Sequence, residues 1–505
     1  MSTHQPLSQV LEACKGAQQI FWSAAGAAPA GPDHEIFLGA DWPEIDPATP
    51  GSPWADAAAT AQVFQRLNTR TWLRIARDFE LWRSSLGEAR ADVPWQTIRA
   101  RWFAIAEAEF RRTQRSDDFL AAVAGAVRVA ADHLAAMTPE QRGQFRGLLQ
   151  ATARARRAVV GAALTGVEIA ATPKQQIWRL GEITVSRYVP LTRGPNPALG
   201  PVLICHGLIG RQTMTDLLPE RSMVRQLLTS GVDVFVLDWG GAGQDRQGPD
   251  LDAIARFVLP AALDRVIAES GAARAILMGI CQGGTLAAVA ATLSQEKLAG
   301  LITAVAPFDF HADTEDTDPS HGLMHLWTRA PALEDLERLL DLSGDLPGDL
   351  LGLLFDQLNP SGTLAKYAVK LLDSGEEPGK LRLFLAMERW LADRPDLPAA
   401  LARTWLVDLY RHNRLADGSL KIDGKAVSLD RLRLPVLNVV AANDHIVPPP
   451  CSRALQRLAP AAAYRELTLP TGHIGAFVSS KSQAVLAPEI ARWLQQVRQE
   501  SISQA

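Results

Sequence analysis

Residues 275–291 read AILMGICQGGTLAAVAA, an apolar run that ends at Cys281 and continues into a stretch of small residues. The apolar run has the length of a buried strand, and the small residues after it favour a closely packed helix. Gly279, Gly283 and Gly284 flank the cysteine, and glycine permits the close backbone contacts of a very tight strand-to-helix turn. The stretch therefore predicts a nucleophile elbow with Cys281 as the nucleophile. The competing interpretation is a buried cysteine in a glycine-rich turn.

Two polar residues downstream complete a predicted catalytic triad. Asp444 lies in AANDHIVPPP (residues 441–450), directly after an apolar run, and His473 lies in LPTGHIGAF (residues 469–477), before the last predicted helix. Alone, such an Asp is commonly a helix cap and such a His a packed or surface residue. The order nucleophile, acid, base is that of the α/β-hydrolase triad, so we predict Asp444 as the acid and His473 as the base.

The rest of the chain has the pattern of a mainly parallel sheet. Short apolar runs end in turn residues and are separated by stretches of helical character, which is what a sheet covered by helices on both faces requires. The sequence therefore predicts an α/β fold, specifically the α/β-hydrolase fold. The runs are IWRLGEITVSRYVP (177–190), PVLICHG (201–207), VDVFVLDWG (232–240), AILMGI (275–280), LITAVAPFDF (301–310) and LPVLNVVAAND (434–444).

At 505 residues the chain exceeds the usual size of one hydrophobic core. We expect residues 1–60, rich in Ala, Gly and Pro, to be loosely ordered, and residues 61–160 to form an all-helical module, for which dimerisation is the generic role. The α/β core is predicted over residues 165–310 and 432–505. Residues 311–431 lack strand patterns and are predicted to be a mainly helical cap inserted into the core.

Acyl transfer needs two backbone N–H groups where the oxyanion develops. The amide of Gln282, next to the nucleophile, is predicted to be one, and Leu208 or Ile209 in the HGLIG loop (residues 206–210) the other. A thiol at a helix N-terminus also favours its thiolate form. His206 and His445 are interpreted as loop residues, because His473 already fills the position of the base.

The composition argues against several other classes of protein. A net charge of −4 gives no basic surface for nucleic acid. The four cysteines have neither metal-type spacing nor the density of a disulfide framework, which favours a reducing, cytoplasmic location with no bound metal or cofactor. No signal-peptide pattern opens the chain, and no uninterrupted apolar run has the length of a transmembrane helix, so no transmembrane segment is expected.

Beyond these patterns, the chain resembles the polyhydroxyalkanoate synthases, most closely the catalytic subunit of the two-component class III enzymes. GICQGG (residues 279–284) resembles the modified lipase box of that class, with Cys in place of Ser. The resemblance covers about residues 165–495. It is carried by TPKQQIWRLGEITVSRYVP (172–190), TMTDLLPERSMVRQLL (213–228), VFVLDWG (234–240), QLNPSGTLAKY (357–367), FLAMERWLADRPD (384–396), DLYRHNRL (408–415), LPVLNVVAANDHIVPP (434–449) and PTGHIGAFVSSKSQ (470–483).

The resemblance implies that Cys281, Asp444 and His473 are the catalytic set. It also implies an (R)-3-hydroxyacyl-CoA substrate, a growing polyester chain or granule surface as partner, and a homodimer. Residues 102–119 (WFAIAEAEFRRTQRSDDF) are similar to the separate activating subunit of class III enzymes. The chain departs from the family at Gly210, where Asn is usual, and near Thr213, where an aromatic residue is usual.

Three functions therefore remain in competition at the level of sequence. The first is an acyltransferase that polymerises (R)-3-hydroxyacyl-CoA and releases CoA through a thioester on Cys281. The second is a thioesterase or polyhydroxyalkanoate depolymerase that uses the same triad. The third is a catalytically idle granule-associated protein, against which the complete triad argues.

Overall fold

The structure is a computed structural model of the 505-residue chain. It describes residues 53–87, 93–147, 150–151, 158, 164, 166–191, 194–241, 248–312, 322–358, 360, 366 and 377–503. Most of the predicted loosely ordered segment, residues 1–52, lies outside the described residues, as does Cys14. The described chain divides into two compact units, one N-terminal and helical and the other built on a sheet.

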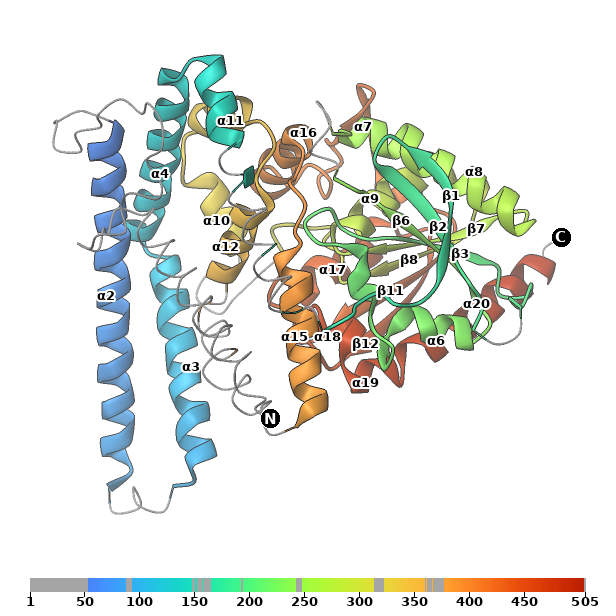
Figure 1. The fold of residues 1–505 in the computed structure, drawn as a ribbon, viewed down its shortest axis with the longest axis horizontal. Coiled ribbons are helices and arrows are strands. Elements are labelled where there is room, and N and C mark those ends of the chain that lie inside the picture. Colours follow the sequence, from blue (N-terminus) through green and yellow to red (C-terminus); the bar gives the residue numbers. More distant parts are fainter. Residues whose placement is uncertain are drawn as a thin grey trace. The chain divides into compact units, whose positions relative to one another are not determined.

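An eight-stranded sheet forms the centre of the second unit, in the order β1-β2-β6-β3-β7-β8-β11-β12 (Figure 1). β1 and β2 pair antiparallel with each other, and β2 pairs antiparallel with β6, whereas the strands from β6 to β12 are parallel. The strands are β1 (Lys174–Leu180), β2 (Ile183–Tyr188), β3 (Pro201–Cys205), β6 (Asp233–Asp238), β7 (Ala275–Ile280), β8 (Leu298–Ala304), β11 (Pro435–Ala441) and β12 (Ala463–Leu469).

Helices cover both faces of this sheet (Figure 1). α8 (Leu259–Ser270) and α9 (Gln282–Ala291) contact each other and the sheet, and α6 (Met223–Thr229) and α20 (Leu486–Ser503) form a second contacting pair. α17 (Pro449–Leu458) packs on β11. With helices on both faces, the parallel strands are buried on both sides, which explains their continuous apolar sequences.

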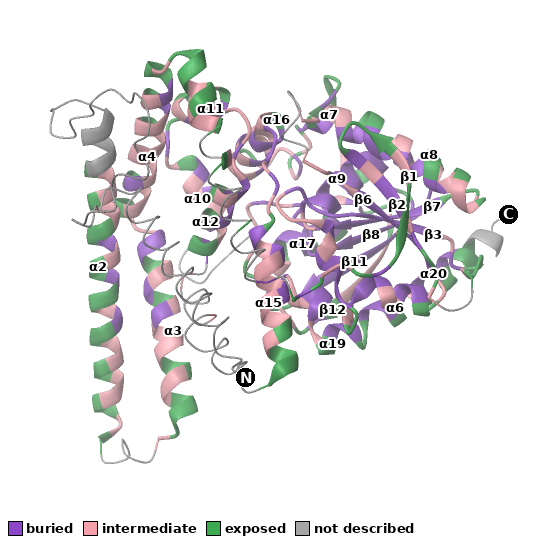
Figure 2. Cartoon of the chain, in the orientation of Figure 1, coloured by how far each residue is buried: buried purple, intermediate pink, exposed green. Residues whose placement is uncertain are grey.

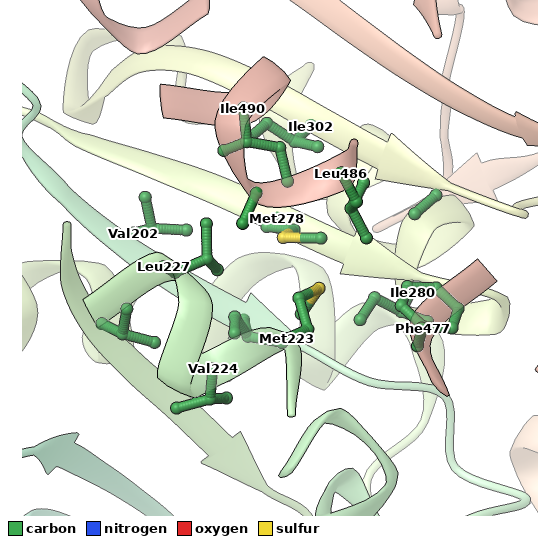
Figure 3. Close-up of a cluster of buried hydrophobic side chains, with 14 of the residues drawn as sticks. Val202, Met223, Val224, Leu227, Met278, Ile280, Ile302, Phe477, Leu486 and Ile490 are labelled. Atoms are coloured by element: carbon green, nitrogen blue, oxygen red, sulfur yellow. The ribbon is translucent and has the colours of Figure 1, made fainter. Parts of the chain in front are cut away.

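The main core lies between the sheet and the α6–α20 pair. Figure 3 shows Met278 and Ile280 of β7 and Ile302 of β8 among side chains from these helices. Met278 and Ile302 have no exposed surface, and Ile280 is 1% exposed. Figure 2 shows that buried residues concentrate on the sheet strands. Because these strands end at the predicted catalytic residues, the packing of the core holds the backbone of the site in place.

The segment between β8 and β11 is mainly helical, as its sequence predicted. Its described elements include α10 (Leu323–Arg329), α11 (Leu333–Ser343), α12 (Gly348–Leu358), α15 (Pro378–Ala392), α16 (Ala399–Arg403) and the π-helix η7 (Thr404–Arg411). It also holds a short antiparallel pair, β9 (Lys421–Ile422) and β10 (Lys425–Ala426). The sequence did not predict this pair, because two-residue strands joined by a tight turn leave too short a pattern to detect.

The N-terminal unit contains α2 (Pro53–Ser85), α3 (Trp95–Gln114) and α4 (Asp117–Ala136). Trp72 of α2 meets Phe110 of α3 edge to face, with ring centroids 5.3 Å apart. The Arg74 guanidinium donates to Glu109 at 2.6 Å. Ser116 caps α4 by accepting from the Phe119 amide at 3.3 Å. A second stretch of the chain belongs to this unit, because α11 packs on α4.

The boundary predicted at residue 60 is wrong. α2 begins at Pro53, inside the segment for which little folding was expected. Proline is tolerated in the first helical turn, where its missing N–H would have no partner, and the alanines that follow are strong helix formers. The Pro and Ala content that suggested a break thus begins a helix instead.

One described helix, α4, is long and apolar enough to cross a membrane by length and composition alone. Its best window has a mean hydropathy of 1.4, and 17% of that window is buried in the structure. The sequence predicted no transmembrane segment, because charged residues interrupt the apolar run of α4. α4 packs against α2, α3 and α11 within its unit.

Candidate active site

Cys281 lies at the turn between β7 and α9, with φ 54° and ψ −126°. A positive φ is uncommon for a residue with a side chain and marks a strained turn. Two backbone hydrogen bonds hold the turn: the Cys281 amide donates to the Ala304 carbonyl, and the Gly284 amide donates to the Cys281 carbonyl, each at 2.9 Å. The local geometry is that of a nucleophile elbow, with the thiol at a helix N-terminus.

The three elbow glycines are required by close contact. A Cβ on Gly279 would lie 2.4 Å from the Gly283 carbonyl oxygen, and one on Gly283 would lie 2.1 Å from the Cys205 carbonyl oxygen. A Cβ on Gly284 would lie 2.3 Å from the Ala306 side chain. Two of these neighbours are backbone atoms that cannot move independently of the sheet, so the glycines allow α9 to start directly against β3 and β7.

Asp444 and His473 meet beside this elbow. Nδ1 of His473 lies 2.7 Å from Oδ2 of Asp444. The other carboxylate oxygen accepts from the backbone amides of Ile446 and Val447, both at 2.9 Å. Since a carboxylate accepts, Nδ1 carries the proton, and Nε2 is left to act on the nucleophile.

Burial lowers the pKa of His473, but the charges of Asp444 and Cys281 outweigh this effect and raise the pKa well above its ordinary 6.5. Hydrogen bonds from His473 to both side chains act in the same direction. The structure thus brings together the three residues that the sequence predicted, from three loops that follow strands β7, β11 and β12. Their arrangement suits proton transfer between the thiol and the imidazole.

The HGLIG loop also lies beside the elbow. The Leu208 amide donates to Oε1 of Gln282 at 3.1 Å, so one of the two predicted second oxyanion donors is already engaged. Gln282 is the first residue of α9, and its own N–H is among the helix N–H groups that have no intrahelical acceptor. This leaves the Gln282 and Ile209 amides as the preferred oxyanion pair. The sequence did not reveal the part played by the Gln282 side chain.

His206 is buried close to His473. Burial, with a smaller contribution from the neighbouring His473, lowers the pKa of His206 to about 4. Nδ1 of His206 lies 3.0 Å from the Gly207 carbonyl, which can only accept, so Nδ1 carries the proton of the neutral ring. The Trp239 indole donates to the His206 carbonyl at 2.7 Å. His206 thus shapes the loop as an uncharged residue.

The other described cysteines lie in different environments. Cys205 is fully buried in β3, and burial raises the pKa of its thiol to about 12. Cys451 is 4% exposed, in the first turn of α17. A thiol with so high a pKa is a poor nucleophile. Among the described residues, no group of three or more His, Cys, Asp or Glu side chains is placed to hold a metal ion.

Comparison with known proteins agrees with this geometry. Residues 200–480 match the family model of the alpha/beta hydrolase fold. The poly(3-hydroxyalkanoate) polymerase subunit PhaC of Allochromatium vinosum is 33% identical over 328 residues, which is 65% of this chain and 90% of the relative. This chain belongs to the PhaC family.

Other PhaC proteins match in the same way. The poly(3-hydroxyalkanoate) polymerase subunit PhaC of Thiocystis violacea is 32% identical over 65% of this chain and 89% of the relative. That of Synechocystis sp. is 33% identical over 65% of this chain and 85% of the relative. The resemblance to the polyhydroxyalkanoate synthases and the predicted α/β-hydrolase fold are both confirmed.

We predict that Gly283→Ala prevents stable folding. The added methyl group would lie 2.1 Å from the Cys205 carbonyl, so α9 or β3 must move, at a cost of about 3 kcal/mol or more. Thermal unfolding and soluble yield measure the effect. Gly125→Ala in α4 is the control, because its Cβ meets nothing within 4 Å. A wild-type melting temperature for Gly283→Ala would contradict the close contact.

His206 should make the fold sensitive to acid. In the unfolded chain it takes up a proton below its ordinary pKa of 6.5, whereas in the folded protein it does so only near pH 4. Between these values the unfolded state binds more protons than the folded state. Lowering the pH from 6.5 to 4 therefore decreases the free energy of unfolding, by up to about 3 kcal/mol. Urea unfolding at pH 7, 5.5 and 4.5 should show a shallower pH dependence for His206→Gln than for the wild type. Identical pH dependence would exclude this role.

Proposed function

We propose that this PhaC-family chain is an acyltransferase that polymerises (R)-3-hydroxyacyl groups from CoA thioesters and releases CoA, with Cys281 carrying the acyl group. The single observation that supports this most strongly is the 2.7 Å contact of His473 with Asp444 beside the strained Cys281 elbow. The relatives named poly(3-hydroxyalkanoate) polymerase subunit PhaC support the choice of substrate.

In the first step, the proton of the Cys281 thiol is held on Nε2 of His473, whose raised pKa favours the ion pair, and the thiolate attacks the carbonyl carbon of the acyl-CoA. The Gln282 and Ile209 amides stabilise the resulting oxyanion. The bond between the carbonyl carbon and the CoA sulfur then breaks, and the imidazolium returns its proton to the CoA thiolate. One thioester replaces another, so this step is nearly thermoneutral.

In the second step, the 3-hydroxyl group of a monomer or chain end attacks a thioester. His473, oriented by Asp444, accepts the hydroxyl proton as the C–O bond forms. The bond between the carbonyl carbon and the thioester sulfur breaks, and the proton passes to the departing thiolate. An oxoester replaces a thioester, which is energetically downhill, so this step drives chain growth.

Water competes with the 3-hydroxyl as nucleophile. The segment between β8 and β11 is the proposed cap that excludes water and so separates a polymerase from a thioesterase. The thioesterase or depolymerase alternative uses the same triad and would release free hydroxy acid. No observation favours it over polymerisation, and the arrangement of Cys281, His473 and Asp444 argues against a catalytically idle protein.

The resemblance to class III enzymes adds further predictions. These are a homodimer, a cytoplasmic location at the polymer granule, and an N-terminal unit that replaces a separate activating subunit. The predicted activator-like tract, residues 102–119, spans the end of α3 and the start of α4, including the Ser116 cap. All of these remain predictions.

Cys281→Ala should abolish CoA release from 3-hydroxybutyryl-CoA without loss of the fold, because it removes only the nucleophile. Cys205→Ala and Cys451→Ala are matched controls and should retain most activity, since neither cysteine lies in the elbow. The measurements are CoA release, polymer formation and thermal unfolding. Turnover by folded Cys281→Ala would refute the proposal. Free 3-hydroxybutyrate from the wild type, with no polymer, would instead favour the thioesterase.

Asp444→Asn and His473→Gln should separate the two steps. An Asn amide facing Nδ1 stabilises the wrong imidazole tautomer, but a thiol is acidic enough to retain part of the acylation. We expect single-turnover CoA release to fall about 10-fold in Asp444→Asn and about 100-fold or more in His473→Gln, and polymer formation to fail in both. Equal losses of single-turnover acylation would contradict this division of roles.

A further inference from the structure

The backbone of the HGLIG loop is held from three directions. The Leu208 amide donates to Gln282 of α9 at 3.1 Å. The Trp239 indole, just after β6, donates to the His206 carbonyl at 2.7 Å. The third contact comes from the segment between β8 and β11, where the Trp390 indole of α15 donates to the Arg211 carbonyl at 2.8 Å. Gln282 and Trp239 lie just after strands of the sheet, whereas Trp390 comes from the segment inserted between β8 and β11.

Trp390 also lies against Gly210. A Cβ on Gly210 would lie 2.8 Å from Cζ2 and 3.4 Å from Cη2 of the indole. The backbone of Gly210 does not have a positive φ, so its conformation is one that other residues adopt. Space for the Trp390 ring, rather than backbone strain, therefore requires glycine here.

The end of α15 that carries Trp390 is anchored to the core unit. Trp390 itself is 7% exposed and belongs to the main hydrophobic cluster. The neighbouring Arg389 donates to the Val167 carbonyl. An indole held in this way presents a fixed surface to the loop, because a close-packed interior transmits displacement instead of absorbing it.

Ile209 lies between the two anchored parts of the loop. On one side the Leu208 amide is bound to Gln282, and on the other Gly210 and the Arg211 carbonyl contact Trp390. We infer that Trp390 is a positioning residue, which sets the direction of the Ile209 N–H as the second oxyanion donor and couples α15 to acyl transfer. This inference rests on the proposed function of Cys281 as an acyl carrier.

The test is a double-mutant cycle with Gly210→Ala and Trp390→Phe. The methyl group of the first variant meets the outer ring atoms of Trp390, and phenylalanine lacks those atoms, so the second substitution should relieve the first. Gly379→Ala, in the first turn of α15, is the matched control, because its Cβ meets nothing within 4 Å. Acylation of Cys281 is followed with 3-hydroxybutyryl-CoA and with a p-nitrophenyl ester, which needs an oxyanion hole but no polymerisation.

We expect Gly210→Ala to lower the acylation rate about 10-fold or more while KM changes less than about 3-fold, because an oxyanion donor acts on the transition state. Trp390→Phe should lower the rate a few-fold, by roughly the loss of one positioning hydrogen bond. In the double variant the rate should return to about that of Trp390→Phe alone. Gly379→Ala should match the wild type, and all folded variants should melt within a few degrees of it.

Independent, multiplicative losses in the double variant would overturn the coupling, as would a change in KM alone. If Gly210→Ala does not fold, the decision passes to two comparisons: Trp390→Phe must lower the rate without raising KM, and the double variant must fold. Failure of either overturns the inference. A wild type that acylates Cys281 but makes no polymer would refute the proposed polymerase and leave the coupling testable. Absence of acylation with both substrates would refute both.

Discussion

The close approach of α9 to β3 and β7 is the constraint on which the rest of the structure depends. The Cα of Gly283 lies so near the Cys205 carbonyl that no side chain fits between them. The helix therefore starts directly at the end of β7, and Cys281 takes a positive φ at the junction. The ends of β3 and β7 and the first turn of α9 are thus held against one another. The loops after β3, β11 and β12 lie close to this contact.

A small number of contacts stabilise the buried charge of Asp444. Asp444 is 5% exposed, and two backbone amides and His473 accommodate its negative charge. A buried charge without such partners would cost several kcal/mol. His206, close by, has a pKa lowered to about 4 and stays neutral, so it adds no repulsion to the protonated form of His473, whose pKa is raised.

The segment between β8 and β11 helps to hold the HGLIG loop in place. Through Trp390 it contacts the same loop that Gln282 and Trp239 hold from the core side. Cys281, Asp444 and His473 come from the core, whereas part of the support for the HGLIG loop comes from the inserted helix α15.

The sequence by itself determined the strands and the elbow and predicted the triad, because these depend on local patterns: apolar runs, glycines at a tight turn, and the order of Cys281, Asp444 and His473. It did not reveal that Gln282 binds the Leu208 amide or that Trp390 lies against Gly210. Trp390 and Arg211 are 179 residues apart, and their contact exists only once α15 has packed on the assembled core. Likewise, the inclusion of α11 in the N-terminal unit was decided by the tertiary structure. Packing energy over many residues outweighs the weak local preferences that the sequence displays.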